Sequence, residues 1–151
     1  SGKGAQYQPL AVRLDDGRLY PSIVAYWGVD TVTCYDPGYE PFSRLPTVRF
    51  DGVVCTDVLE HCPEDDLPWI LDELFLFAKK FVFANVACYP ARKRLASGEN
   101  AHCTIKHAAW WQSLLNQVSA RYPSVRYQFT FDEVRTTSDG GRALLTASAA
   151  R

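Results

Sequence analysis

The sequence predicts an α/β fold with a Rossmann-like mixed sheet, mostly parallel with a C-terminal antiparallel hairpin, and with helices on both faces. Short apolar runs alternate along the chain with longer amphipathic segments, which is typical of strands joined by crossover helices. Two strand-like runs near the end flank residues 138–141, Ser-Asp-Gly-Gly, a sequence that favours a hairpin turn. The 151 residues contain no repeat and no linker-like tract, so we expect residues 1–151 to form a single domain.

The first half of the chain is predicted to contain short elements. Residues 10–17 are compatible with a strand and a turn, and residues 20–27 with a short helix. Residues 31–35, Thr-Val-Thr-Cys-Tyr, are β-branched and aromatic and stop at an Asp-Pro-Gly turn signal, which predicts a strand. A second apolar run at residues 50–55 predicts another strand, in the interior of a parallel sheet.

The second half repeats a pattern of helix and strand. Residues 63–79 carry leucines and other apolar residues at helical spacing, with acidic residues near the start, which predicts a crossover helix. Residues 80–87 are almost continuously apolar and predict a buried strand. Residues 107–122 predict a second helix that ends before a proline. Residues 125–131 alternate with a period of two and, with residues 142–149, predict the closing hairpin.

Composition and charge narrow the class of protein. Hydrophobic residues make up 47% of the chain and charged residues 22%, which is typical of a globular protein. The net charge of -1 provides no overall attraction to nucleic acid, and no apolar run approaches the roughly 18 residues that span a bilayer. The five cysteines are odd in number, and three lie in or beside apolar runs, so we expect free thiols and a cytoplasmic location.

Residues suited to ligand binding lie where strands are predicted to begin or end. Gly2 and Gly4 belong either to a glycine loop, in which bare backbone N–H groups can approach a ligand, or to an ordinary turn. Asp36 follows the strand predicted at residues 31–35, and a carboxylate there can accept hydrogen bonds from both hydroxyls of a ribose. An Asx turn before Pro37 is the alternative interpretation of Asp36.

Residues 45–61 resemble the class I methyltransferases that use S-adenosylmethionine, in particular their small-molecule branch. Leu45-Pro46 is followed by a Phe-Asp-x-Val strand and then by residues 58–61, Val-Leu-Glu-His. The resemblance spans most of the chain and implies a sheet in which the last strand lies between the fifth and the sixth. It also implies a first strand before the glycine loop, which we expect upstream of Ser1.

The resemblance implies that the chain is an enzyme, a transferase that moves a methyl group from S-adenosylmethionine to a small-molecule or metabolite acceptor by in-line displacement. It also implies cofactor-binding residues at four places along the chain. These are Gly2 and Gly4 under the methionine end, Asp36 at the ribose, Leu45 against the adenine, and Thr56, Asp57 and Val58 along the cofactor and the mouth of the substrate pocket.

A general base is needed only if the acceptor is protonated. We take His102 and His61 as the candidate catalytic residues, ahead of Glu60 and of His107, which we assign to the first turn of its helix. His102 follows the strand at residues 80–87 in a polar stretch, and therefore belongs at the edge of the sheet where the cofactor would bind. For His61, a structural hydrogen bond that fixes the strand-to-helix turn is the alternative.

Other polar residues allow two interpretations each. Asn85 either ties strand ends together or faces the substrate, and the basic residues at 89–94 form either a solvated loop or a contact for an anionic acceptor. We predict no metal site, because the combinations of cysteine and histidine lack paired C-x-x-C spacing. Those combinations are Cys55, His61 and Cys62, and Cys88, His102 and Cys103.

Two alternative functions stay open. A nicotinamide-dinucleotide-binding oxidoreductase would keep the fold, although the glycine loop lacks the G-x-G-x-x-G spacing and the Val-Leu-Glu-His segment would have no role. A degenerate Rossmann-like binding module without catalysis is compatible with a chain that begins after the first strand.

Overall fold

The structure is a computed structural model that describes residues 11–151, and the chain forms two compact units, Ser1–Thr47 and Val48–Arg151. Gly2 and Gly4 lie outside the described residues. Among the helices in the described part, none has the length and apolar character needed to cross a membrane.

The first unit contains a small antiparallel hairpin and a short helix. Strands β1 (Val12–Arg13) and β2 (Leu19–Tyr20) pair with each other, and helix α1 spans Ile23–Trp27. The Ser22 hydroxyl caps α1 by accepting a hydrogen bond of 3.1 Å from the Ala25 backbone N–H. These elements confirm the predicted strand, turn and helix, within narrower bounds.

The strand predicted at residues 31–35 is wrong, because the structure places these residues in an irregular segment. β-branched and aromatic residues favour a strand only where a neighbouring strand completes the hydrogen-bonded ladder. Among the described residues of this unit, only β1 and β2 form a sheet. The Asp36 N–H donates instead to the Phe42 carbonyl at 3.0 Å, which closes a loop that contains the 3-10 helix η2 (Glu40–Phe42).

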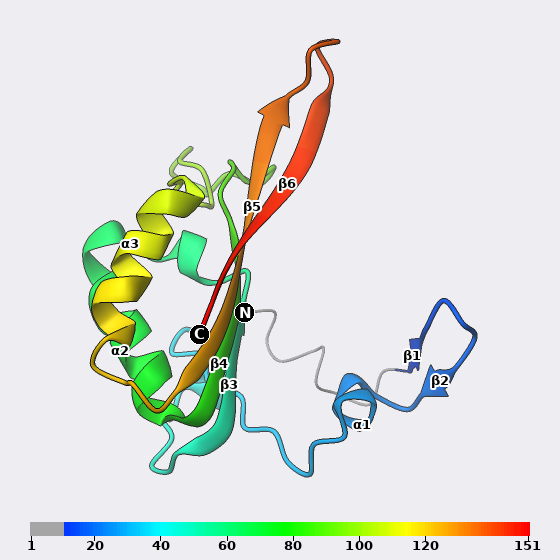
Figure 1. The fold of residues 1–151 in the computed structure, drawn as a ribbon, viewed down its shortest axis with the longest axis vertical. Helices are drawn as coiled ribbons and strands as arrows, with labels where there is room; N and C mark the ends of the chain where they lie inside the picture. Colours follow the sequence, from blue (N-terminus) through cyan, green and yellow to red (C-terminus); the bar gives the residue numbers. More distant parts are fainter. Residues whose placement is uncertain (1–10) are drawn as a thin grey trace. The chain divides into compact units, whose positions relative to one another are not determined.

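The second unit is built on a four-stranded mixed sheet with the order β3-β4-β5-β6 (Figure 1). Its strands span Phe50–Thr56, Ala78–Ala87, Arg126–Thr136 and Arg142–Ala150. The pairs β3-β4 and β4-β5 are parallel, and β5-β6 is antiparallel. The predicted mixed α/β fold, with a mostly parallel sheet and a C-terminal hairpin, is therefore confirmed for this unit.

The position of the last strand differs from the one that the resemblance implies. Strand β5 pairs directly with β4 from Phe81↔Arg126 to Ala87↔Asp132, so β6 is not inserted between them. The tight turn between β5 and β6 brings β6 to the remaining edge of β5, because β4 already occupies the other edge. The expected position of the last strand, between the two preceding strands, is therefore wrong.

The two helices α2 (Leu67–Phe77) and α3 (Ala108–Ser119) cover the same face of the sheet (Figure 1). Alternate residues of β4 that face them, such as Val82 and Ala84, are fully buried, whereas Phe81 on the opposite face is 42% exposed. Both β-α-β crossovers step in the same direction along the sheet, and right-handed crossovers then place both helices on one face. The prediction of helices on both faces is therefore wrong for the described part of this unit.

The predicted helices have shorter bounds in the structure. The predicted helix at residues 63–79 begins with a 3-10 turn, η4 (Glu64–Asp66), and ends at Phe77, because Ala78–Lys80 already belong to β4. Ala78 is fully buried at this junction.

The core between helices and sheet contains Phe75, whose ring stacks on Tyr122 at 5.6 Å between centroids and meets Tyr127 edge-on at 5.9 Å.

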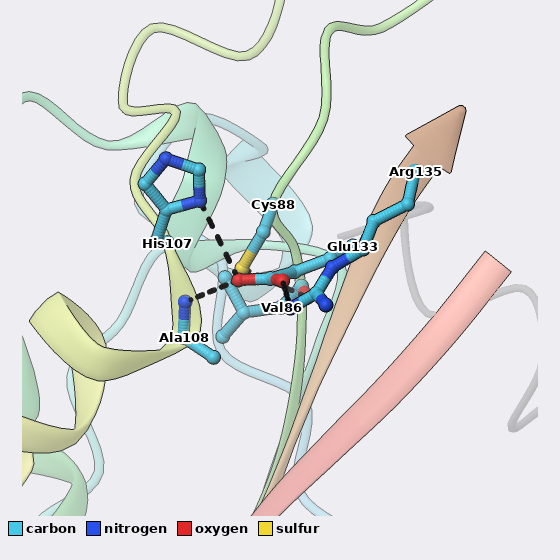
Figure 2. Close-up of polar contacts among 6 residues, drawn as sticks. All are labelled: Val86, Cys88, His107, Ala108, Glu133 and Arg135. Atoms are coloured by element: carbon cyan, nitrogen blue, oxygen red, sulfur yellow. Dashed lines mark hydrogen bonds and ion pairs between the residues drawn. The ribbon is translucent and has the colours of Figure 1, made fainter. Parts of the chain in front are cut away.

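Glu133 of β5 joins the sheet to the start of α3 (Figure 2). Its Oε1 atom accepts a hydrogen bond of 2.8 Å from the Ala108 N–H and lies 3.6 Å from His107 Nδ1, while Arg135 Nη2 lies 3.2 Å from Oε2. His107 thus precedes α3 at the N-cap position. The expectation that it lies in the first turn of the helix is wrong by one residue. The Ala108 hydrogen bond, followed by the Arg135 contact, lowers the pKa of the Glu133 carboxyl.

Replacing Glu133 by glutamine is expected to lower the free energy of unfolding at pH 7 by about 0.5–1 kcal/mol, because a negative charge at a helix N-terminus is lost. A lowered pKa means that this stabilisation is present above the usual glutamate value of 4.5 and disappears as the pH falls through the folded-state value. Urea unfolding of both proteins at pH 7 and at about pH 3 measures the difference. A difference of the same size at both pH values would contradict this role of the charge.

Candidate functional site

The chain turns sharply where β3 ends, beside the end of β4. Thr56 is paired with Asn85 of β4, and the Asp57 N–H donates to the Asn85 carbonyl at 3.1 Å. Asp57 has a φ of 53°, in the left-handed region that aspartate adopts more readily than most residues. Its side chain is exposed, whereas Thr56 and Val58 are half-buried. The three predicted cofactor-lining residues therefore lie together at the carboxyl end of a parallel strand.

Glu60 is fully buried just beyond this turn, within the 3-10 helix η3 (Leu59–His61). Its Oε1 atom accepts a hydrogen bond of 3.2 Å from the Ala87 N–H at the end of β4. Its Oε2 atom is also buried but has no hydrogen-bond partner in the structure. Burial raises the pKa of the Glu60 carboxyl, because the charged form is poorly solvated there.

His61 and His102 lie in contact, with their ring centroids 4.7 Å apart and their planes nearly perpendicular. His61 Nδ1 donates to the Ala101 carbonyl and His102 Nδ1 to the Tyr89 carbonyl, each at 2.6 Å. A carbonyl oxygen only accepts, so each Nδ1 carries a proton, and Nε2 of the neutral ring keeps its lone pair. The structure thus brings the two predicted catalytic residues together. His61 also makes a structural hydrogen bond, but to Ala101 in the loop of His102 and not within the strand-to-helix turn, where its alternative role had placed it.

The loop that presents His102 is organised by the side chain of Asn100, which the sequence analysis did not identify. Asn100 Oδ1 accepts hydrogen bonds of 2.9 Å from the N–H groups of Ala91 and His102, and its Nδ2 donates to the Ala91 carbonyl at 3.0 Å. An asparagine that follows a glycine-containing turn is the signal that could have pointed to this role. Without the Asn100 amide, the position of the His102 backbone would lose its main local anchor.

A second anchor ties this loop to the Glu60 segment. Thr104 is buried, and its N–H donates to the Glu60 carbonyl at 3.0 Å while its hydroxyl donates to the Cys62 carbonyl at 2.8 Å. These bonds bring residues about forty positions apart to one place. Thr104 was also missed from the sequence, where it is one polar residue among several in the loop.

A pocket lies beside His102. It has a volume of about 270 Å³ and is lined by Leu95, Glu99, Asn100, His102 and Cys103. This volume lies just below the range of about 300–1,000 Å³ that is typical of small-molecule sites. His102 therefore faces a space that can admit a small polar group.

Asn85 ties strand ends together, which is one of its two predicted roles. Its Nδ2 donates to Thr130 Oγ1 at 2.8 Å and to Asp132 Oδ2 at 3.1 Å, which links β4 to β5. A half-buried amide is thereby satisfied at the carboxyl edge of the sheet.

The other predicted cofactor residues belong to the first unit. Asp36 Oδ1 accepts a hydrogen bond of 3.0 Å from the Gly38 N–H, so the Asx turn considered as its alternative role is present. This bond uses one carboxylate oxygen and leaves Oδ2 able to accept from a ligand. Leu45 is 49% exposed, as expected of a residue available to pack against a ligand ring.

Cys55 and Cys88, which lie in and directly after the strands β3 and β4, have unreactive thiols. All five cysteines are free, and burial raises the pKa of Cys55 to about 12. Burial, together with the nearby Glu133 carboxylate, also raises the pKa of Cys88 to about 12. The Cys88 thiol points to the Val86 carbonyl at 3.9 Å (Figure 2). Both thiols therefore stay protonated at neutral pH and do not act as nucleophiles.

No model of a protein family, no curated protein and no solved structure matches this chain.

Proposed function

We propose that this chain transfers a methyl group from S-adenosylmethionine to a small-molecule or metabolite acceptor by in-line displacement. The observation that carries the proposal is the position of residues 58–61, Val-Leu-Glu-His, directly after the carboxyl end of the parallel strand β3. Ligands of open α/β sheets bind outside the carboxyl ends of their strands. The methyltransferase-like signature thus coincides with the edge of the sheet where such chemistry takes place.

The residues at this edge fit a cofactor with polar groups. The left-handed backbone of Asp57 turns the chain and leaves the carboxylate exposed, while Thr56 and Val58 beside it remain partly accessible. Thr56, Asp57 and Val58 would line the cofactor, and the resemblance to class I methyltransferases assigns the ribose to Asp36 of the first unit. S-adenosylmethionine would supply a methyl group that is already activated on its sulfonium centre. The protein would therefore contribute mainly by aligning the acceptor with this methyl group.

The histidine pair can accept a proton from the acceptor. Nδ1 of His102 is held by the Tyr89 carbonyl, which fixes the ring and leaves Nε2 as the basic atom. His61 lies against this ring and is held in the same way by the Ala101 carbonyl. General-base catalysis of this kind typically contributes about 10²–10⁴-fold in rate. It is needed only if the acceptor atom carries a proton at neutral pH.

A binding module without catalysis is the second candidate function. Two observations favour it: β6 lies at the edge of the sheet, and both described helices of the second unit lie on one face. Each differs from the architecture that the resemblance to class I methyltransferases implies. Cofactor binding is therefore the first property to measure.

Calorimetry and thermal unfolding with S-adenosylmethionine, S-adenosylhomocysteine and NAD separate the candidates. We expect both adenosyl compounds to stabilise the chain, by about 2.7 kcal/mol when the ligand is present at 100 times its Kd, and NAD to have no effect. A shift with NAD alone would favour the oxidoreductase. The absence of a shift with all three would favour the binding module and contradict the proposed function.

A further inference from the structure

We propose that Glu60, His61 and His102 form a binding site for a divalent transition-metal ion of the zinc and cobalt type. The proposal goes beyond methyl transfer and does not depend on it, because it rests on these three side chains alone. It also departs from the expectation of no metal site, which was based on combinations of histidine with cysteine. Here the third ligand is a carboxylate.

The geometry brings three ligand atoms together from two distant segments. One potential ligand atom of each side chain lies within 4.8 Å of those of the other two. Zinc binds nitrogen and oxygen at about 2.0–2.2 Å, so ligands of one ion lie at most about 4.4 Å apart. Binding of an ion therefore requires the three side chains to close slightly around it. The backbone hydrogen bond from Thr104 to Glu60 already holds the two segments side by side.

The carboxylate of Glu60 provides an independent sign of a cation. The residue is fully buried, yet only Oε1 has a hydrogen-bond partner, and Oε2 has none. Leaving a buried polar oxygen without a partner typically costs about 1–3 kcal/mol, and more if the group is charged. A cation bound to Oε2 would remove this penalty, and a carboxylate oxygen of Glu60 lies within 4.8 Å of a ring nitrogen of each histidine.

The histidines are held as metal-binding histidines usually are. Each donates its Nδ1–H to a backbone carbonyl, His61 to Ala101 and His102 to Tyr89. In metal sites such a bond fixes the tautomer and the orientation of the ring, so that the other nitrogen can bind the ion. Here Nε2 is that nitrogen in both rings.

The ligand set selects the class of ion. Two imidazoles and one carboxylate suit zinc, iron, cobalt or nickel, whereas magnesium and calcium prefer sites made of oxygen ligands alone. Three protein ligands leave at least one coordination position open, as in catalytic zinc sites. His61 is exposed and His102 lines the adjoining pocket, so water or an oxygen atom of a small ligand can reach that position.

The metal probe must distinguish binding at this site from binding by the neighbouring cysteine thiols. Cys103 is exposed beside His102, and Cys62 follows His61, so thiolates could bind added zinc independently. Cobalt(II) is the suitable probe, because its visible absorption reports the coordination geometry and a near-ultraviolet charge-transfer band appears only when a thiolate is bound.

The test is a titration of the full chain with Co²⁺ and with Zn²⁺, followed by absorption and by calorimetry in the absence of any methyl donor. The variants are Glu60→Gln, His61→Ala and His102→Ala. His107→Ala is the matched control, because His107 is an exposed histidine outside the cluster. Glu60→Gln keeps an oxygen for the Ala87 N–H, so it removes the charge with little change to the fold.

We expect the unchanged chain and His107→Ala to bind one Co²⁺ each, without a thiolate band, and each of the other variants to bind at least tenfold more weakly. Far-ultraviolet circular dichroism confirms that each variant is folded, and Glu60→Gln decides the result if a histidine variant is not. The proposal is overturned if the unchanged chain shows no saturable binding, if Glu60→Gln binds as tightly as the unchanged chain, or if binding produces the thiolate band. None of these results affects the binding of S-adenosylmethionine, which is measured separately.

Discussion

Replacing Phe75 by alanine is expected to lower the free energy of unfolding by about 3–5 kcal/mol, a large part of the 5–15 kcal/mol typical of a whole protein. Phe75 is fully buried in α2, and its ring lies between those of Tyr122 and Tyr127. Tyr122 lies just after α3 and Tyr127 lies in β5, so the cavity would open where both helices meet the sheet. The loss therefore combines the transfer of the ring to water with the cost of a cavity that large neighbouring rings cannot fill.

Urea unfolding followed by circular dichroism measures this effect, and Leu76→Ala is the matched control. Leu76 is the next residue in the same helix but is 51% exposed, so its replacement should change the free energy of unfolding by less than about 0.5 kcal/mol. Equal losses for the two variants would mean that α2 does not pack as described.

Replacing Asp36 by asparagine is expected to weaken the binding of S-adenosylmethionine by about 10- to 100-fold. Hydrogen bonds to a charged group contribute about 1.5–3 kcal/mol, and a factor of ten corresponds to about 1.4 kcal/mol. Asparagine keeps the side-chain oxygen that accepts from the Gly38 N–H, so the Asx turn should survive. The loss then measures the ribose contact itself and not the local fold.

Calorimetry with S-adenosylhomocysteine gives the affinity without turnover. Asp30→Asn is a suitable control, because Asp30 is an exposed aspartate of the same unit. Unchanged affinity in Asp36→Asn would assign Asp36 to the turn alone and remove it from the proposed cofactor site.

Elements of the second unit could be predicted from the sequence because their patterns are local. The apolar run of β3 and the helical spacing in α2 and α3 each specify an element within a dozen residues or so. The segment at residues 31–35 has an equally good strand composition but lacks a partner strand among the described residues. The prediction of the strand order was wrong for a related reason. The place of β6 depends on which edge of β5 is free, and no local sequence pattern encodes this.

The candidate site was predictable in part. His61 and His102 could be singled out because each follows a strand that ends at the same edge of the sheet. Their contact, and the buried carboxylate of Glu60 beside them, depend on hydrogen bonds made by Asn100 and Thr104 across the loop. Short polar residues of this kind are common in loops, and the sequence alone does not show which of them is buried.

The order of strands in the second unit is also their order along the chain, and this has a consequence for folding kinetics. From β3 to β6, each strand finds its partner in the next strand of the sequence, so no pairing has to wait for a remote segment. The antiparallel pair β5-β6 closes the smallest loop and has the lowest entropic barrier, whereas the parallel pairs join residues 28 (Phe50↔Ala78) and 45 (Phe81↔Arg126) positions apart and form more slowly. The sheet can therefore grow strand by strand as the polypeptide leaves the ribosome.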